Sequence, residues 1–431
     1  MSILRRQLRL PRHRATTANL CAAYPFLAEA GLGARGVYMG TNLLTGGSGF
    51  AYDPFEAYTS GLLTNPNMLL AGEPGTGKSS TAKVFIYRSV GVFGRWVAIA
   101  DPKGEYLPLA DALGLSVIKL HPGGAHRLNP LDPGPAGLDD GPDELARRQT
   151  TMVAALLASV LHRDLTPVED AVLGWTITHL ARLNADRHHP EPVTLNDVVA
   201  VMADPTEGMA RLARTSPIEL ARSVEAAIYG LGKLLDRSLR GMFDGPTNVT
   251  IDWDGPGIVL DLSAVHHDPE ALTLVMIATT AWLQAVLARR DGPRRIQVLD
   301  EAWSLLGSER TSKYLQACWK LSRAYGVANL AIIHRLSDLR AQADDGTSAS
   351  KVSMGLLADT QTRILMRQSP DQVPEAKELL GLTSTEADLL PRLVKGRALW
   401  KIGNSHTAVV AHVIGGVERG FCDTDSRMSN L

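Results

Sequence analysis

The segment MLLAGEPGTGKS, from Met68 to Ser79, decides which fold this chain adopts. Its first four residues are apolar without alternation, which predicts a short strand buried on both faces. Glycines then turn the backbone, and the stretch from Ser79 to Ser89 predicts a helix. A strand, a glycine-rich turn and a helix in this order are typical of a phosphate-binding loop.

The predicted loop suits a nucleoside triphosphate for physical reasons. Glycines let consecutive backbone N–H groups point at phosphate oxygens, and the helix N-terminus adds a partial positive charge. Lys78 is placed to reach the β- and γ-phosphates, and the hydroxyl of Ser79 suits a magnesium ion. We therefore expect ATP and Mg²⁺ as cofactors. The predicted binding residues are Gly72, Glu73, Pro74, Gly75, Thr76, Gly77, Lys78, Ser79 and Ser80.

Two adjacent acids follow a second apolar run. The segment RIQVLDE, from Arg295 to Glu301, reads as a buried strand that ends in Asp300 and Glu301. Beside a phosphate-binding loop, the first acid holds magnesium and the second polarises the water that attacks the γ-phosphate. The alternative is that both acids begin the helix expected from Ala302, where negative charge is favoured. With the loop upstream, we favour the catalytic interpretation.

Other unalternated apolar runs predict further parallel strands within an α/β fold. They are Trp96 to Ala100, Val117 to Leu120, Ile258 to Leu262, Leu330 to Ile333 and Arg363 to Met366. Residues 398–402 and 407–414 predict a closing hairpin around Gly403. Between Gly141 and Gly245 the apolar spacing becomes helical, which predicts an all-helical insertion.

The resulting fold prediction is a RecA-like nucleotide-binding core with a mostly parallel sheet and an inserted helical subdomain. Its expected parts are a basic arm and lead-in segment over residues 1–60, and a first part of the core over 61–140. The helical insertion spans 141–245, and the second part of the core, with the hairpin, spans 246–431.

The chain as a whole is almost neutral. Its 431 residues carry 44 basic and 45 acidic side chains, so overall charge implies neither nucleic acid nor an acidic substrate. Five arginines nevertheless precede the first acidic residue, Glu29: Arg5, Arg6, Arg9, Arg12 and Arg14. Such an arm attracts DNA or anionic lipid phosphate, although a solvated terminus is the commoner outcome.

The sequence favours the cytoplasm. Residues 1–10 lack the apolar run of a secretion signal, and three widely spaced cysteines suit a reducing compartment. The segment from Ala271 to Ala288 approaches the length of a membrane span, but it contains threonines and a glutamine and lies between predicted strands. We interpret it as a buried core helix and expect no transmembrane helix.

Several motifs together resemble the ATPases of conjugative type IV secretion systems, in the HerA/FtsK superfamily. The motifs are Asp101-Pro-Lys-Gly-Glu105-Tyr106, Leu128 to Asp132, Asp300-Glu-Ala-Trp303, Leu321 to Gly326, His334 to Asp338 and Leu379 to Leu389. The resemblance runs from about Asp53 to the hairpin and is closest to the TraC/TrwK-like energising ATPase. It implies channel proteins as partners and a place at the inner face of the cytoplasmic membrane, reached through those partners.

The resemblance also implies hexameric rings with ATP between subunits. An arginine of one subunit would then meet the γ-phosphate held by its neighbour. Arg323 occupies the favoured position, with Arg335 and Arg363 as competitors; without the resemblance, Arg323 reads as a solvated helix residue. Asp101 and Glu105 would face the metal or the attacking water, although the same residues also form a good turn.

The chain departs from this family at two points. The family usually has glutamine where this chain has His334, so the sensing of the γ-phosphate by that side chain is in question. The energising ATPases also generally carry a large domain ahead of the motor, whereas little more than sixty residues precede the loop here. A separate protein would supply that domain, or the chain works without it.

Three functions follow from these patterns. The leading one is an ATP-hydrolysing motor that energises channel assembly or substrate transfer. The second is a DNA-translocating pump like the coupling protein of the same systems or like FtsK. The third is a weakly hydrolysing ATP-binding assembly scaffold, for which His334 is the best argument.

Overall fold

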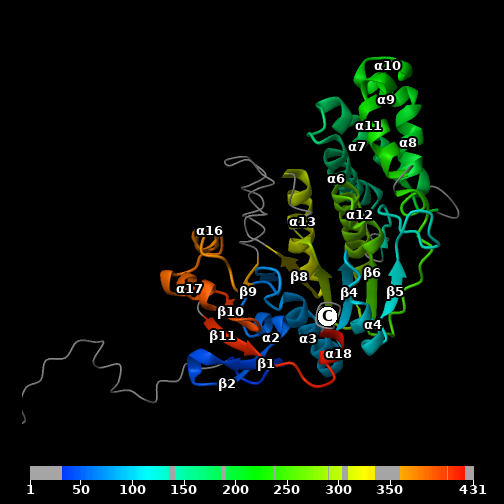
Figure 1. Cartoon of the computed structure of the whole chain (residues 1–431). Coiled ribbons are helices and arrows are strands. Elements are labelled where there is room, and N and C mark those ends of the chain that lie inside the picture. The colour runs from blue at the N-terminus through cyan, green and yellow to red at the C-terminus, as the bar shows by residue number, and fades with distance from the viewer. Residues whose placement is uncertain are drawn as a thin grey trace, which may run out of the picture.

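One sheet of eleven strands runs through the part of the chain that the structure describes. In the computed structural model this part comprises residues 32–134, 141–185, 191–235, 239–289, 291–302, 309–334, 360–404 and 406–422. The strands are β1 (Val37–Asn42), β2 (Ser48–Tyr52), β3 (Met68–Ala71), β4 (Trp96–Asp101), β5 (Ser116–Lys119), β6 (Gly257–Asp261), β7 (Arg295–Leu299), β8 (Val327–Ile333), β9 (Thr362–Leu365), β10 (Arg397–Ile402) and β11 (His406–His412). Their order across the sheet is β2-β1-β11-β10-β9-β3-β8-β7-β4-β6-β5 (Figure 1).

The sheet consists of a parallel and an antiparallel part. From β9 to β5 every neighbouring pair is parallel, whereas β10, β11, β1 and β2 pair antiparallel. Each apolar run that predicted a strand forms one, and the predicted hairpin is β10–β11. The α/β fold with a mostly parallel sheet is therefore confirmed.

Helices cover both faces of the sheet. On one face, α3 (Lys78–Phe93) and α4 (Leu107–Leu113) pack in a core with alternate residues of β3 and β4 and with the antiparallel strands. On the other face, α12 (Pro269–Leu287) and α13 (Glu309–Ser322) pack on the remaining strand residues. This two-sided cover is why the parallel strands read as unbroken apolar runs.

The segment before the phosphate-binding loop, which we expected as a lead-in over residues 1–60, contributes two strands to the sheet. Strands β1 and β2 and helix α2 (Pro54–Thr59) lie within these residues, and β1 pairs with β11 from the far end of the chain. Gly40 allows this pairing: its φ is 154°, and a Cβ there would come within 2.0 Å of the carbonyl oxygen of Ala411. The five N-terminal arginines lie outside the described residues.

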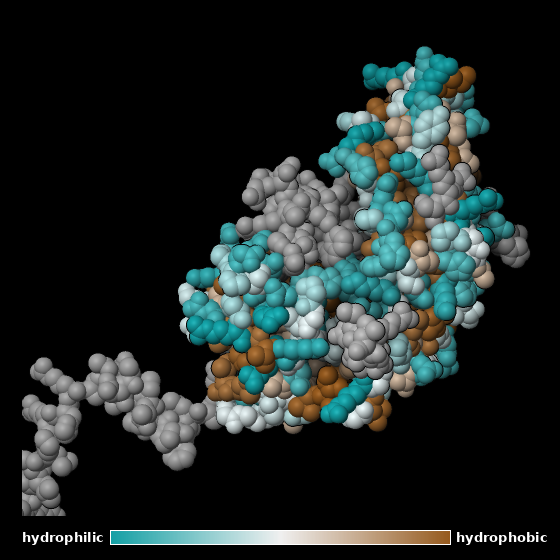
Figure 2. Space-filling view, in the orientation of Figure 1, coloured by the Kyte–Doolittle hydropathy of each residue, from teal (hydrophilic) through white to brown (hydrophobic). Residues whose placement is uncertain are grey.

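The helical insertion stands on the sheet as a tower (Figure 1). Its helices are α6 (Pro142–Leu161), α7 (Pro167–Ala185), α8 (Leu195–Ala203), α9 (Glu207–Ala213), α10 (Pro217–Ser223) and α11 (Glu225–Leu235). Its interior belongs to the same apolar cluster as α12 and strands β3 and β4, so the tower has no separate core. Figure 2 shows a mostly hydrophilic tower with some apolar side chains. Leu212 of α9 and Ile218 of α10, the helices labelled at the tip in Figure 1, are 66% and 69% exposed.

The one described helix long and apolar enough to cross a membrane is α12. Of its most apolar 18-residue window, 83% is buried inside the fold. The expectation of a buried core helix is therefore confirmed.

Candidate nucleotide-binding site

The loop between β3 and α3 has the backbone of a phosphate cradle. At Gly72 a Cβ would lie 2.4 Å from the Cβ of Met366, so no larger residue fits without displacing Met366, which follows β9. Gly77 caps α3 with a φ of 105°, a left-handed conformation that L-residues avoid. The sixteen-residue α3 follows at once, so its N-terminus points its partial positive charge into the loop.

Lys78 places its ammonium group inside this loop. Its Nζ donates hydrogen bonds to the carbonyl oxygens of Gly72 and of Glu73, the latter at 2.9 Å. Burial lowers the pKa of Lys78 to about 8, although the charge of Asp300 opposes the shift. A triphosphate would offer stronger partners than two neutral carbonyls, because bonds between ions are about twice as strong.

The acids lie beside the loop because of the strand order. A single strand, β8, separates β3 from β7, and all three are parallel, so their carboxyl ends gather at one edge. Lys78, Asp300 and His334 accordingly line one cleft of about 490 Å³. Its lining comprises Pro74, Gly75, Gly77, Lys78, Ser79, Ser80, Lys103, Glu105, Asp300, Ile332, His334, Lys395, Ile414, Arg419 and Cys422.

Asp300 is 4% exposed and suits a cation. Burial, and then the charge of Glu301, raise the pKa of Asp300 to about 7, while Lys103 lowers it. A bound divalent ion would hold this carboxylate ionised, since a cation inverts the local pKa balance. Mg²⁺ takes only a few protein ligands alongside phosphate oxygens. Asp300 and the hydroxyl of Ser79, in the first turn of α3, would supply them.

Glu301 is held in an uncommon position. Its φ is 54°, in the left-handed region that costs an L-residue about 1 kcal/mol. Its Oε1 lies 2.7 Å from Nε2 of His334 and forms a salt bridge with Nζ of Lys103. Burial alone would raise the pKa of Glu301, but these two partners outweigh it and lower the pKa to about 2. The carboxylate is therefore ionised, as a base for water must be.

Asp101 and Glu105 lie in one tight turn at the end of β4. Both oxygens of Asp101 accept backbone bonds: Oδ1 from Lys103 at 3.2 Å and Glu105 at 3.1 Å, and Oδ2 from Tyr106 at 2.8 Å. Gly104 supports the turn with a φ of 70°. Asp101 thus shapes the turn rather than lining the cleft, whereas Glu105 does line it; their roles toward nucleotide stay predictions.

Lys103 is the residue of this turn that our sequence reasoning passed over. The motif that contains Asp101 and Glu105 also contains Lys103, so the signal was present. The turn directs the lysine at the acids: its Nζ contacts Glu301 and lies 2.9 Å from Nε2 of His334.

Arg323 lies away from the nucleotide cleft of its own chain. It precedes β8, at the end of the sheet opposite the loop, and donates to the carbonyl of Thr64 at 3.1 Å. A contact with a γ-phosphate would therefore need a second chain. Of its competitors, Arg363 is tied to the carbonyl of Leu380 at 2.8 Å, and Arg335 lies outside the described residues, as does Trp303.

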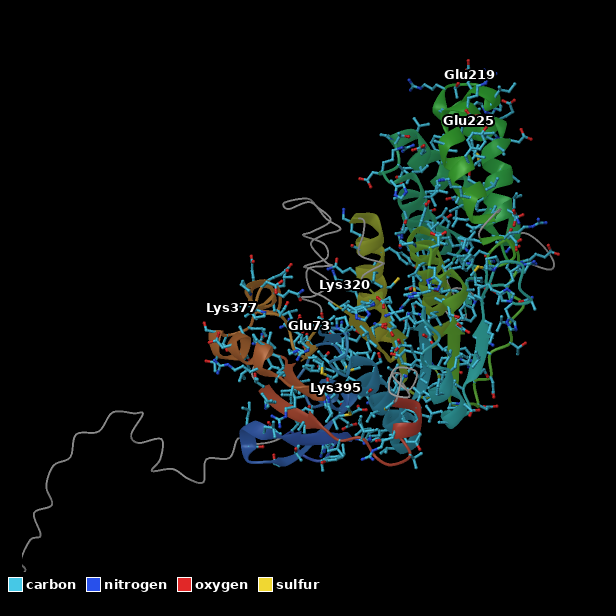
Figure 3. All side chains as sticks on the ribbon, in the orientation of Figure 1. Glu73, Glu219, Glu225, Lys320, Lys377 and Lys395 are labelled. Carbon is cyan, nitrogen blue, oxygen red and sulfur yellow. The ribbon has the colours of Figure 1, made fainter. Side chains whose placement is uncertain are left out.

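The C-terminal end of the described chain also lines the cleft, which sequence reasoning did not foresee. The short helix α18 (Arg419–Cys422) lies against α3, and Ser80 Oγ donates to the carbonyl of Cys422 at 3.2 Å. From the turn before β10, Gly396 N donates to the carbonyl of Thr76 at 3.0 Å, and Lys395 joins the lining. Figure 3 shows Lys395 near the base of the sheet, far from Glu219 and Glu225 at the tip of the tower.

The strand order, the loop and the two-sided helical cover define a RecA-like P-loop α/β fold. No family model matches the chain, and no curated protein matches its sequence. Among solved structures it is similar to VirB4 of Thermoanaerobacter pseudethanolicus, with a TM-score of 0.67 and 21% identity over 89% of this chain and 98% of that chain. It is also similar to the bacterial conjugative coupling protein TrwB, with a TM-score of 0.56 and 17% identity over 81% of this chain and 85% of that chain. The predicted RecA-like fold is thereby confirmed.

Proposed function

We propose that this chain is an ATP-hydrolysing motor of a conjugative or type IV secretion system, which energises channel assembly or substrate transfer. The observation that carries the proposal is the shared cleft, where Lys78 of the loop and Asp300 at the end of β7 meet. The motif resemblance to conjugative ATPases and the similarity of fold to VirB4 and TrwB support the same function.

Each residue has a distinct part in this proposal. The loop and Lys78 bind the phosphates, and Ser79 and Asp300 would hold Mg²⁺, which would neutralise charge that develops on the phosphates. Glu301 accepts a proton from the attacking water, and His334 orients Glu301 through the 2.7 Å contact. TrwB, of the same fold, has been solved with ADP and Mg²⁺ and with a non-hydrolysable ATP analogue, which supports these cofactors.

The direct test is a turnover assay with Mg²⁺ and ATP on the purified chain and on Lys78→Ala. The unaltered chain should release phosphate repeatedly, and Lys78→Ala should release almost none, because the γ-phosphate loses its cation. Nucleotide binding without turnover in the unaltered chain would favour an assembly scaffold instead. A lack of binding to any nucleoside triphosphate would overturn the proposal.

We further propose that the motor acts as a homo-oligomer, in the form of a hexameric ring, with Arg323 completing the site of a neighbour. Because Arg323 and Lys78 lie at opposite ends of the sheet, two inactive variants should complement each other. Mixing Lys78→Ala with Arg323→Ala subunits should restore part of the turnover, since one interface then contains both residues. Absence of any rescue, with assembly intact, would remove Arg323 from this role.

A DNA-translocating pump is the second candidate, and the similarity of fold to the coupling protein TrwB favours it. Turnover with and without DNA, at low and raised salt, separates the two. A pump should be stimulated by DNA, and its binding should weaken steeply with salt. A channel-energising motor should instead respond to partner proteins at the inner face of the membrane.

A further inference from the structure

The salt bridge between Lys103 and Glu301 occupies the carboxylate that the proposed function needs free. To accept a proton from water, Glu301 must offer an oxygen to that water. In this structure Oε1 is taken by the ammonium group of Lys103 and by Nε2 of His334. The carboxylate is 4% exposed in this arrangement, so little of it faces the cleft.

We propose that Lys103 is a positioning residue that clamps Glu301 until a γ-phosphate draws the ammonium group away. This inference rests on the proposed ATPase function. It adds that Glu301 becomes free to act as a base when ATP is bound but not when ADP is bound. Lys103 thereby discriminates the two nucleotides.

The geometry allows this exchange by side-chain motion alone. The backbone at Lys103 is fixed by the carboxylate of Asp101, whereas the lysine stem is long and flexible. Lys103 lines the same cleft as Lys78 and Ser79, and its side chain is 25% exposed, more than that of Glu301. Its ammonium group is therefore the mobile partner of the pair, and it already faces the place where phosphates bind.

The charges around Lys103 favour the exchange when a triphosphate arrives. In this structure Glu301, Asp300 and Glu105 all stabilise its positive charge, and the ammonium groups of Lys103 and Lys78 repel each other. A γ-phosphate would add negative charge between the two lysines, and Mg²⁺ would take up the charge of Asp300. ADP would leave that position without a negative group, so the clamp on Glu301 would stay closed.

Competition for one cation has a thermodynamic consequence. If Glu301 and the γ-phosphate compete for Lys103, removing the charge of Glu301 must strengthen the binding of a triphosphate more than that of a diphosphate. The gain must become smaller once Lys103 is gone, because only the direct repulsion between Glu301 and the γ-phosphate then remains. A lysine with a purely structural role would produce no such dependence.

The experiment is a double-mutant cycle read by equilibrium binding. The dissociation constants of ADP and of a non-hydrolysable ATP analogue, both with Mg²⁺, are measured for four proteins: the unaltered chain, Glu301→Gln, Lys103→Met and the double variant. Glu301→Gln should tighten the analogue relative to ADP by about fivefold to tenfold, a usual size for coupling between two sites. In the Lys103→Met background the same change should alter that ratio much less.

Two further variants serve as controls for the role of Lys103. Lys395→Met removes another lysine of the same cleft, and Glu301→Gln should still tighten the analogue in that background. Lys103→Arg keeps the charge and should keep the tightening. A gain of undiminished size in the Lys103→Met background, or no gain in the unaltered background, overturns the clamp. Binding of ADP would in that case keep the proposed function standing. Absence of all nucleotide binding overturns both.

Discussion

The parallel strands from β9 to β5 and the antiparallel strands β10, β11, β1 and β2 share one sheet but use their side chains differently. Strands β4, β6, β7 and β8 are buried along their whole length, and polar groups follow their carboxyl ends. Of the antiparallel strands, β1 and β2 mix buried with exposed positions, whereas β10 is buried after its first residue and β11 in its middle. The antiparallel part packs behind α3, for example through Thr81 and His412 at 2.9 Å. The residues of the proposed site therefore lie where the carboxyl ends of the parallel strands meet. The antiparallel part supports α3, the helix that follows the phosphate-binding loop.

The largest expected effect tests the parallel half. Glu301→Gln should lower ATP turnover by about 10²- to 10⁴-fold, the usual contribution of a positioned base, while nucleotide binding persists. Steady-state phosphate release measures the turnover, and a nucleotide titration measures the binding. Glu386→Gln is the matched control: Glu386 lies beside β10 and β11, so turnover per folded molecule should stay nearly unchanged. An equal loss of binding in Glu301→Gln would remove Glu301 from catalysis.

A large effect on the free energy of unfolding is expected at Trp400. Its fully buried ring packs 5.1 Å from Phe50 and 5.3 Å from Tyr52, measured between ring centroids. Trp400→Ala should lower the free energy of unfolding by about 3–5 kcal/mol, because it removes packed area and leaves a cavity. Denaturant unfolding measures this loss, and turnover per folded molecule should change little. A selective loss of turnover at full stability would show that the antiparallel part takes part in the chemistry.

His412 gives the antiparallel half a dependence on pH. Burial, with a small addition from Arg88, lowers the pKa of His412 to about 4. The unfolded chain takes up this proton near pH 6.5, so the stabilisation is present above that pH and is lost as the pH falls towards 4. Between pH 7 and pH 5 the loss should be about 2 kcal/mol. His412→Gln should flatten this part of the profile in denaturant titrations, and an unchanged slope would contradict the assignment.

The smallest effect is expected at Thr407, which ties β11 to the helical connection between β9 and β10. Its hydroxyl donates to Oε1 of Glu386 at 2.6 Å, and Glu386 also accepts from Lys401 at 2.8 Å. Thr407→Val should lower the free energy of unfolding by about 1 kcal/mol, because one bond to a buried carboxylate is lost. Thermal unfolding measures it. Thr273→Val is the control of smaller effect, because the hydroxyl of the half-buried Thr273 makes an exposed hydrogen bond.

Much of the parallel half could be predicted from sequence because its signals are local. A strand buried on both faces reads as an apolar run, and the phosphate-binding loop and the acids each lie within a few residues. Met68 to Ala71 and Arg295 to Leu299 accordingly form the expected strands. The resemblance motif from Leu379 to Leu389 also has a local role, since Thr383 and Glu386 cap α17 (Ser384–Leu389) reciprocally.

The rest depends on contacts between distant segments. β1 and β2 are short and interrupted by glycine, so their pattern is weak, and β1 owes its place to β11. Ser80 meets Cys422 across 342 residues of sequence, which no local pattern encodes. Lys103 was visible within its motif, yet its direction toward Glu301 follows from the turn that Asp101 ties.

The shared core of sheet and tower has a mechanical consequence. Helix α13, the first described element after Ala302, packs against α6, and α6 also packs against α12. A displacement of α13 or α12 would therefore be passed to α6 at the base of the tower. The twenty-residue α6 is about 30 Å long, so a tilt of about 5° at its base would move its far end by about 2.5 Å.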